Sequence, residues 1–278
     1  TVMNLFIFIL SGCCVGISVL FAQFYGQRDL EAFRREGFLA LVFGLLLTAA
    51  LALGALVLLG PLLSLIQTPE GLRPLVAEYL TVIFLGLPVT FLYNLASAAL
   101  RAAGNTLAAL FPLMAATLLN IGLDLLLVGA CGMGISGAAI ATVFSQGFAA
   151  LLALGYLRWR QPQLLFGRAD MRFDWSMLRR TASFGLVSAL QQSAVYIGKL
   201  LVQGAVNSMG NEAINAYTAA TRIEGFANSF GDSGAEAISV FVAQNTGAGD
   251  PKRVKRGFFT GMLLMIGLGL TMSLVMFV

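Results

Sequence analysis

One carboxylate stands inside a long apolar stretch of the sequence. Asp124 lies within the run NIGLDLLLV, whose other residues suit a membrane-spanning helix. A charged side chain at the centre of a bilayer costs about 2.5–3.5 kcal/mol on insertion scales, so such a residue is a functional candidate. Asn120 precedes it by four residues and therefore lies on the same helix face.

Thr142 brings a third oxygen to a similar depth. Asp124 lies nine residues before a turn near Met133, and Thr142 lies nine residues after it. At about 1.5 Å per residue, both reach about 14 Å from the same end of two helices, close to mid-membrane. The three side chains form either a functional site or a structural hydrogen-bond cluster that ties the two helices together.

Two further apolar stretches carry polar stripes. The polar residues recur every three or four positions, which holds them on one helix face, and such faces line water or each other rather than lipid. Counted from a turn near Gly210, Lys199 and Arg222 reach similar depth and Glu224 lies slightly deeper. We expect Lys199 to pair with Glu224, for structure or for handling substrate or protons. The stripes comprise Ser188, Gln192, Tyr196, Lys199, Gln203 and Asn207, then Tyr217, Thr221, Glu224, Asn228, Asp232, Glu236 and Ser239.

The composition indicates that lipid is the solvent of these elements. The 278 residues are 58% hydrophobic and 11% charged, with a mean hydropathy of +0.86. An ordinary soluble domain is about 45–50% apolar and about 25% charged. There is no histidine, which excludes imidazole ligands and bases. An all-α membrane protein of about eight spans is expected, at 2–25, 38–66, 76–100, 107–130, 137–157, 181–208, 212–244 and 258–278.

The basic residues predict the orientation. Of 17 Lys and Arg, 14 fall in alternate loops, which places these loops on the cytoplasmic side. Because they are divided among several loops, they form no single patch for nucleic acid. The longest such loop, within 158–180, is interpreted as an interfacial linker; the alternatives are a grip on anionic lipid or a control of access.

A phrase near the N-terminus returns near the C-terminus. Residues 17–38 and 238–259 share nine identities in 22 positions without a gap, and each copy ends a span and enters a basic loop. The two copies therefore run in the same direction, as in parallel transporter repeats, and should superpose by rotation about an axis near the membrane normal. The offset of 221 implies six spans in each half. On that count the chain covers spans two to nine of twelve and is truncated at both ends.

Gly132, Gly134 and Gly137 match the GxGxxG pattern of dinucleotide-binding proteins. No acidic residue follows at the required distance of about 20 positions. We therefore interpret these glycines as a tight turn between two spans.

Several segments together resemble the bacterial multidrug and toxic compound extrusion (MATE) transporters. They are AQFYGQRDLEAFRR, LRAAGNT, LLNIGLDLLLV, GISGAAIATVFSQ, GAVNSMGNEAINAYTAATRIEGF and VFVAQNTGAGD. The resemblance implies two six-helix lobes around a central cavity, with 1–160 in the first lobe, 161–175 as a cytoplasmic basic linker and 176–278 as the start of the second.

The resemblance also implies a function: export of organic cations or drugs by alternating access, driven by Na⁺ or H⁺. The family's first-lobe cation site matches Asn120, Asp124 and Thr142, which would hold the metal ion if Na⁺ is used. Its other Asp belongs to a helix absent here. The expected partners are the bilayer and drug-like molecules. A monomer in the cytoplasmic membrane is expected, with no enzyme activity and no cofactor. The candidate cavity residues are Gln192, Tyr196, Lys199, Gln203, Tyr217, Thr221, Glu224 and Asn228.

Three other functions stay open from the sequence. A flippase for a lipid-linked precursor needs cationic side chains in the first lobe, whose spans carry Asp124 and no Lys or Arg. A membrane-embedded enzyme needs a metal motif, paired carboxylates or a nucleophile elbow, and none is recognisable. The third alternative is a fragment that does not transport.

Overall fold

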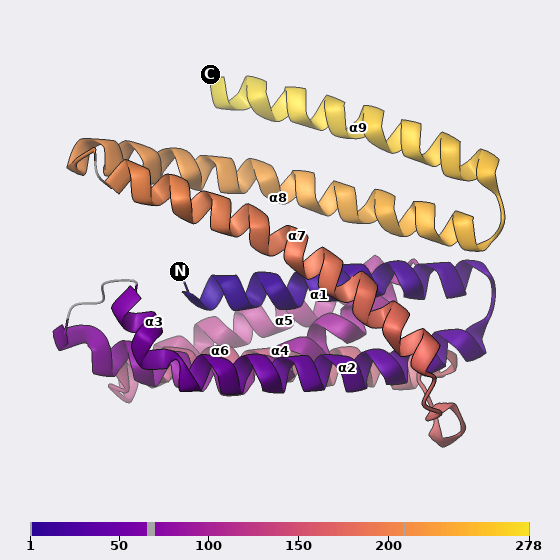
Figure 1. Cartoon of the computed structure of the whole chain (residues 1–278), viewed down its shortest axis with the longest axis horizontal. Helices are drawn as coiled ribbons and strands as arrows, with labels where there is room; N and C mark the ends of the chain where they lie inside the picture. Colours follow the sequence, from indigo (N-terminus) through magenta and orange to yellow (C-terminus); the bar gives the residue numbers. More distant parts are fainter. Residues whose placement is uncertain (1, 66–69, 208, 278) are drawn as a thin grey trace.

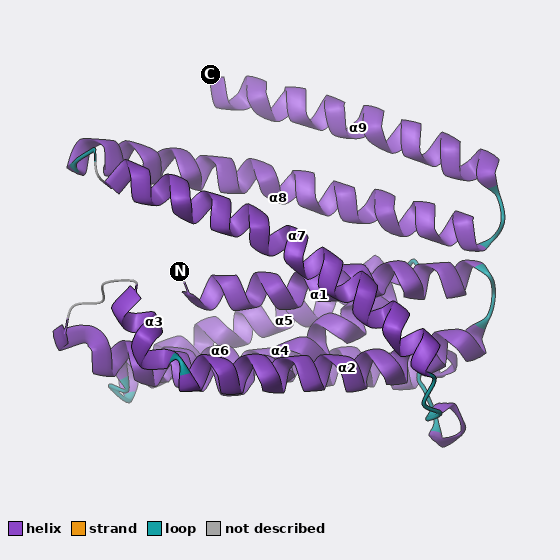
Figure 2. Ribbon diagram, viewed as in Figure 1, coloured by secondary structure: helices purple, strands orange, loops and turns teal. Residues whose placement is uncertain are grey.

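The structure is a computed structural model that describes residues 2–65, 70–207 and 209–277, and throughout these residues the chain is helical with short turns (Figure 2). The long helices are α1 (Val2–Gly26), α2 (Leu30–Val57), α4 (Arg73–Ala102), α5 (Thr106–Asp124), α6 (Gly134–Arg160), α7 (Trp175–Asn207), α8 (Asn211–Gly247) and α9 (Pro251–Phe277). The shorter elements are α3 (Leu59–Leu65), a π-helical segment (Leu125–Ala130), and 3₁₀ turns at Glu70–Leu72, Pro162–Leu164 and Arg168–Asp170.

Each expected span corresponds to a long helix. Within the described residues, six helical stretches are long and apolar enough to cross a membrane, and α7 and α8 are outside that set. These two helices have 33 and 37 residues, so length does not exclude them, but they carry the polar stripes. Their crossing of the membrane stays a prediction.

Two spans differ in detail from the expectation. The span expected at 38–66 begins earlier, as α2, and breaks after Val57 before α3; residue 66 lies outside the described residues. The span expected at 107–130 changes from α-helix to π-helix after Asp124. The turn that follows contains Gly132 and Gly134 with φ of 65° and 57°, a left-handed conformation that glycine adopts without steric penalty. This confirms the interpretation of the glycine motif as a turn.

The helices form a bundle and a hairpin joined by an oblique helix (Figure 1). α1, α2, α4, α5 and α6 pack together, while α8 and α9 form a hairpin beside them. α7 packs along α1 and α2 and meets α8 mainly near the turn they share. The α1–α2 turn, the α6–α7 linker and the α8–α9 turn lie at one end of the molecule, and together with the helix ends that adjoin them they carry most of the basic residues; we call this the basic end.

The core of the bundle combines aromatic rings with glycine. Phe21 and Phe33 are fully buried, with ring centroids 4.7 Å apart. Gly44 of α2 lies against the ring of Phe91, and a Cβ at Gly44 would fall 1.7 Å from that ring's Cζ. Close approach over small residues is how helices gain dispersion contacts where lipid supplies no hydrophobic driving force.

The repeat is visible in the turns that end α1 and α8. The amides of Gln27, Arg28 and Asp29 donate to the carbonyls of Gln23, Tyr25 and Phe24. The corresponding amides, each 221 positions later, donate to the corresponding carbonyls. Asp29 and Asp250 then cap the following helices by accepting from the amides of Ala32 and Arg253, both at 2.9 Å. The α4–α5 turn uses the same amide pattern, so this turn is a local device of the sequence and does not by itself prove the repeat.

The two copies also touch each other reciprocally. A Cβ on Gly26 would fall 1.9 Å from the carbonyl oxygen of Gln244, and a Cβ on Gly247 would fall 2.1 Å from the carbonyl oxygen of Gln23. Gly26 and Gly247 are equivalent in the repeat, and so are Gln23 and Gln244. Both helices run toward the basic end (Figure 1). The same direction of the two copies is thereby confirmed, and the reciprocal contact places a local two-fold axis between them.

The start of α7 is fixed on the first bundle by small and polar residues. Cβ atoms at Gly12 and Gly16 would collide with backbone atoms of α7, at 2.8 Å from the Ser188 oxygen and 2.2 Å from the Phe184 oxygen. The hydroxyl of Thr181 lies 3.0 Å from both carboxylate oxygens of Glu36, which is fully buried on α2. A buried carboxylate needs such a donor, so this contact ties α7 to α2.

The linker between α6 and α7 is folded back onto α2. Asp170 is buried and accepts hydrogen bonds from the Gly167 amide at 2.9 Å and from Arg34 Nε at 3.0 Å. The Gly167 amide and the Arg34 guanidinium hold the pKa of Asp170 below its usual range. The linker is thus attached by charge as well as by the buried side chain of Leu164.

Candidate functional site

Asp124 lies where α5 changes its helical form. The α-helix ends at this residue, and the π-helical segment begins at the next. Short π segments occur often at functional sites, because one extra residue per turn leaves the regular hydrogen-bond ladder incomplete. The sequence gives no signal for this change, since the residues on both sides are ordinary apolar helix formers.

Asp124 and Asn120 each carry a buried atom without a hydrogen-bond partner among the described residues. The atoms are Asp124 Oδ1 and Asn120 Nδ2, and both side chains are partly buried. Asn oxygen and nitrogen are assigned from such networks, so the Asn120 amide can offer either atom. Buried polar atoms are normally paired, and unpaired ones point to a role beyond structure.

Thr142 lies on α6, which packs beside α5. Its hydroxyl donates to the Ala138 carbonyl at 2.9 Å, so its oxygen lone pairs remain available as acceptors. The structure therefore places the three predicted residues on two adjacent helices. Their joint use as a cation site stays a prediction, and no group of three or more His, Cys, Asp or Glu suited to a metal occurs in the described part of the chain.

Two further residues bear on this region, Gln146 by its depth on α6 and Tyr79 by its proximity to Asp124, and sequence reasoning missed both. Gln146 lies one helical turn beyond Thr142, and its buried Oε1 has no partner among the described residues. Counted from the turn at Met133 it matches the depth of Asn120, a signal that the sequence offered. Tyr79 of α4 lies near enough to Asp124 for an electrostatic interaction between the two side chains. The Tyr79 hydroxyl donates to Met3 Sδ at 3.2 Å. We call these five residues the Asp124 cluster: Tyr79, Asn120, Asp124, Thr142 and Gln146.

The expected pair between the two polar helices is confirmed. Lys199 Nζ lies 3.3 Å from Glu224 Oε1, with side chains 47% and 51% exposed. Asn228, one turn further along α8, donates to the same carboxylate oxygen at 2.9 Å. The pair joins α7 to α8 across the hairpin that these helices form, 11 residues before Gly210 on α7 and 14 after it on α8.

The remaining stripe residues divide between two surroundings. Ser188 and Gln192 lie against α1 at Gly16 and Gly12, a position that the stripe pattern did not predict. Tyr196 packs on Phe8 with ring centroids 5.3 Å apart. The second group is partly exposed and consists of Gln203 on α7 and of Tyr217 and Thr221 on α8. The side chain of Asn207 lies outside the described residues.

An ion pair between α4 and α8 was not predicted. Arg101 Nη2 lies 2.9 Å from Glu236 Oε1, and each side chain is about three-quarters buried. The pair borders a cavity of about 580 Å³ between α4, α5 and α8, whose wall includes Tyr93, Leu110 and Val240. Sequence reasoning placed Arg101 in a loop and Glu236 in a stripe, and only the packing of α8 on the bundle brings them together.

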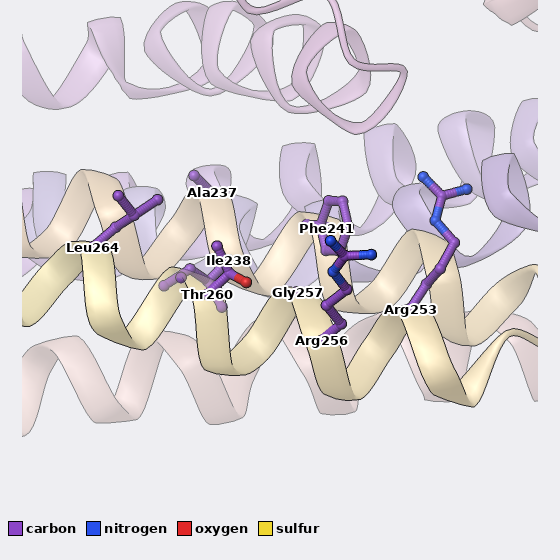
Figure 3. Close-up of a pocket in the computed structure, with 9 residues that line it drawn as sticks. Ala237, Ile238, Phe241, Arg253, Arg256, Gly257, Thr260 and Leu264 are labelled. Atoms are coloured by element: carbon purple, nitrogen blue, oxygen red, sulfur yellow. The ribbon is translucent and has the colours of Figure 1, made fainter.

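A second, more open groove runs between α8 and α9 (Figure 3). It has a volume of about 480 Å³, with an apolar wall and two arginines at the basic end. In the first repeat the equivalent faces of α1 and α2 are covered by α7, through Gly16 and through Phe43, which lies against Gly185. The residues lining the groove are Ala237, Ile238, Phe241, Arg253, Arg256, Gly257, Thr260, Gly261 and Leu264.

Comparison with known proteins gives a consistent result. The chain is 28% identical over 270 residues to the probable multidrug resistance protein YoeA of Bacillus subtilis (strain 168), covering 95% of this chain and 58% of that protein. It is 28% identical over 235 residues to the FAD transporter of Shewanella oneidensis (strain MR-1), covering 82% of this chain and 51% of that protein. The chain thus spans between about half and three-fifths of the length of these relatives.

Solved structures share the fold. A structure described as the outward-facing conformation of a multidrug resistance MATE family transporter of the MOP superfamily superposes with a TM-score of 0.88 at 22% identity. The superposition covers 97% of this chain and 60% of that one. The arrangement of helices is therefore that of MATE transporters.

The sequence profile of the MatE family matches residues 1–126 and 188–278. These two stretches contain both copies of the repeat, and together they make up well over half of the chain. With six apolar helices suited to crossing a membrane among the residues that the structure describes, the chain is a multi-pass membrane protein that belongs to the MatE family.

Proposed function

We propose that the chain acts in a cation-coupled exporter of organic cations or drugs, working by alternating access across the cytoplasmic membrane. Membership of the MatE family makes it part of a transporter rather than an enzyme. The observation that carries the proposal is the unpaired, buried Oδ1 of Asp124 within an apolar helix of this fold. A carboxylate there is stabilised when it holds a cation or a proton, and that dependence can couple an ion to a change of conformation.

Asp124, Asn120 and Thr142 are proposed as the coupling site, for Na⁺ or for H⁺. Hard cations prefer oxygen ligands, which all three residues can supply. Lys199, Glu224 and the middle of both stripes are proposed to line the substrate path. The basic end is proposed to face the cytoplasm, in keeping with the distribution of Lys and Arg.

Replacement of Asp124 tests the coupling role. In an exporter-deficient bacterial strain, we expect Asp124→Asn to abolish drug resistance with unchanged membrane expression, for this chain or for a longer coding sequence that contains it. Glu78→Gln is the matched control, because Glu78 is exposed on α4 and its replacement removes the same negative charge as Asp124→Asn. Resistance retained by Asp124→Asn would reduce this residue to a structural role. Uptake by vesicles under an imposed Na⁺ gradient or pH gradient identifies the coupling ion.

A second candidate substrate class is a flavin dinucleotide. The observation in its favour is the 28% identity to a protein named FAD transporter. Vesicles loaded with FAD or with a fluorescent organic cation discriminate the two classes, since the cation alone should move if the drug proposal holds.

A further inference from the structure

A polar pocket at the basic end joins the two copies of the repeat. Its volume is about 540 Å³, and it lies where the ends of α1 and α8, the linker and the start of α9 come together. It includes Gly26 and Gln244, the residues that touch at the crossing of the two copies. The residues lining it are Tyr25, Gly26, Arg28, Leu30, Gln163, Leu164, Phe241, Gln244, Asn245, Ala248 and Arg253.

Arg28 keeps a backbone conformation that suits glycine. Its φ is 59°, and among the described residues no other non-glycine residue has a positive φ. The equivalent position of the second copy is Gly249, with φ of 68°. A left-handed residue with a Cβ is strained relative to the ordinary conformation, because its Cβ lies too close to the following carbonyl oxygen. Such an outlier points to a use for the side chain, because glycine would form the turn with less strain.

The two arginines of the pocket have no partner. Neither Arg28 nor Arg253 makes a side-chain ion pair or hydrogen bond within the described part of the chain. Both are exposed. Some arginines toward this end are paired, such as Arg34 with Asp170 and Arg180 with Gln23, whereas others in the described residues, such as Arg172 and Arg256, are unpaired like the two in the pocket. The described lining of the pocket contains no Asp or Glu. Two like charges facing one cavity repel each other, and an anion between them removes that repulsion.

We propose that this pocket binds a phosphate-bearing ligand, with Arg28 and Arg253 on the phosphate. Guanidinium groups present paired donors that match phosphate oxygens, and Asn245 and Gln163 add amides to the same wall. Inner-leaflet phospholipid and free phosphate share this chemistry. The lipid fits better, because the pocket lies at the ends of the apolar helices α1 and α9 and its lining includes Leu30, Leu164 and Phe241.

The neighbouring groove supports a ligand with an apolar chain. Arg253 and Phe241 line both the pocket and the groove between α8 and α9, where Leu264 and Ile238 follow toward the apolar part of the helices (Figure 3). A headgroup in the pocket can therefore place an acyl chain along these side chains. A ligand held by Arg28 from one copy and Arg253 from the other fastens the two copies together at their crossing.

Lipid-dependent stability tests the proposal. The full chain is placed in nanodiscs of phosphatidylcholine, and its unfolding temperature is followed as phosphatidylglycerol is added. We expect stabilisation by phosphatidylglycerol, with a half-maximal lipid fraction at least about tenfold higher in Arg28→Gly and in Arg253→Gln, because losing one charge-assisted hydrogen bond weakens binding by about that factor or more. Arg172→Gln is the control, since Arg172 is an exposed arginine of the linker and its replacement gives the same net charge as either pocket variant.

Arg28→Gly also separates binding from folding. Glycine relieves the left-handed strain, so we expect this variant to be more stable than the parent in phosphatidylcholine while losing the response to phosphatidylglycerol. Equal responses of the parent and both pocket variants would overturn the proposal. So would an equal loss in Arg172→Gln, which indicates a general charge effect. In a third experiment, inorganic phosphate is added at constant ionic strength. If phosphate stabilises the parent protein and this stabilisation is lost in both pocket variants, the pocket is a phosphate site and its ligand is the free anion.

Discussion

Asp124, Asn120 and Gln146 each leave a buried polar atom without a hydrogen-bond partner among the described residues, as do Ser97 and Ser145 elsewhere in the bundle. In hydrocarbon such an atom is destabilising, since no water replaces the missing bond. Asp124 and Asn120 could be predicted, because a carboxylate and an amide one turn apart stand out in an apolar run. Gln146 was missed because the sequence does not distinguish a functional glutamine on α6 from one that makes structural hydrogen bonds. Only the structure shows whether its side chain has partners.

Replacing Gln146 tests whether the cluster extends beyond the predicted residues. We expect Gln146→Leu to raise the coupling-ion concentration for half-maximal transport about tenfold, the effect of losing one hydrogen bond of about 1–2 kcal/mol to a charged group. Folding should be preserved, because the lost oxygen has no protein donor. Gln191→Leu is the control, since Gln191 is exposed on α7. An unchanged ion dependence in Gln146→Leu would exclude this residue from the site.

The pair of Lys199 and Glu224 is testable by exchange of charge. We expect Lys199→Glu to cripple transport, because it sets two carboxylates together, and Glu224→Lys in the same protein to restore part of it. Asn228 can serve the exchanged pair as well, since its amide also accepts hydrogen bonds. Lys252→Glu, at the start of α9, controls for added negative charge. If the double variant transports no better than Lys199→Glu, the pair is not what maintains function.

Asp170 predicts a pH dependence of the linker. Its pKa is lower in the folded chain than the usual value of about 3.9. Its contribution to stability is therefore fully present above about pH 4 and is lost as the pH falls through the folded pKa. Hydrogen exchange of residues 161–174 should show protection at neutral pH that declines in this acid range. Asp170→Asn should weaken protection at neutral pH, whereas Asp232→Asn, on the exposed face of α8, should behave as the parent. Protection independent of pH would contradict the assignment.

At the scale of elements, the long apolar stretches of the sequence predict the long helices. The first residues of several helices are marked by capping residues such as Asp29, Asn105 and Asp250. The π segment, the break after Val57 and the oblique course of α7 could not be predicted. They depend on which surfaces meet across the bundle: the contact of Thr181 with Glu36 and the approach of Gly12 and Gly16 join residues far apart in sequence. The same reason explains why the pair of Arg101 and Glu236 was missed.

The crossing of α1 and α8 predicts the effect of a single methyl group. We expect Gly26→Ala or Gly247→Ala to destabilise the chain by about 1–3 kcal/mol, because the added Cβ meets backbone oxygen that cannot turn away. Gly54→Ala on α2 is the control: nothing lies within 4 Å of its Cβ position, so the helix should be unchanged or more stable. The measurement is the free energy of unfolding in detergent. A Gly26→Ala variant as stable as Gly54→Ala would show that the helices do not approach this closely.

At the scale of the whole molecule, the family and the helical architecture were accessible from sequence, because composition demands lipid and the motifs occur in family order. The repeat of 17–38 and 238–259 predicted the common direction of α1 and α8, which the structure confirms. The sequence could not show that the two copies touch, since a repeat fixes equivalence but no distance.

That contact is self-complementary: Gly26 lies on Gln244 as Gly247 lies on Gln23. It is the arrangement found at the two-fold interface of an isologous homodimer, where one patch meets its own copy. A polypeptide carrying a single repeat could therefore associate with an identical chain through this patch, in parallel orientation. The crossing of α1 and α8 therefore has the form of a dimer interface contained within one chain.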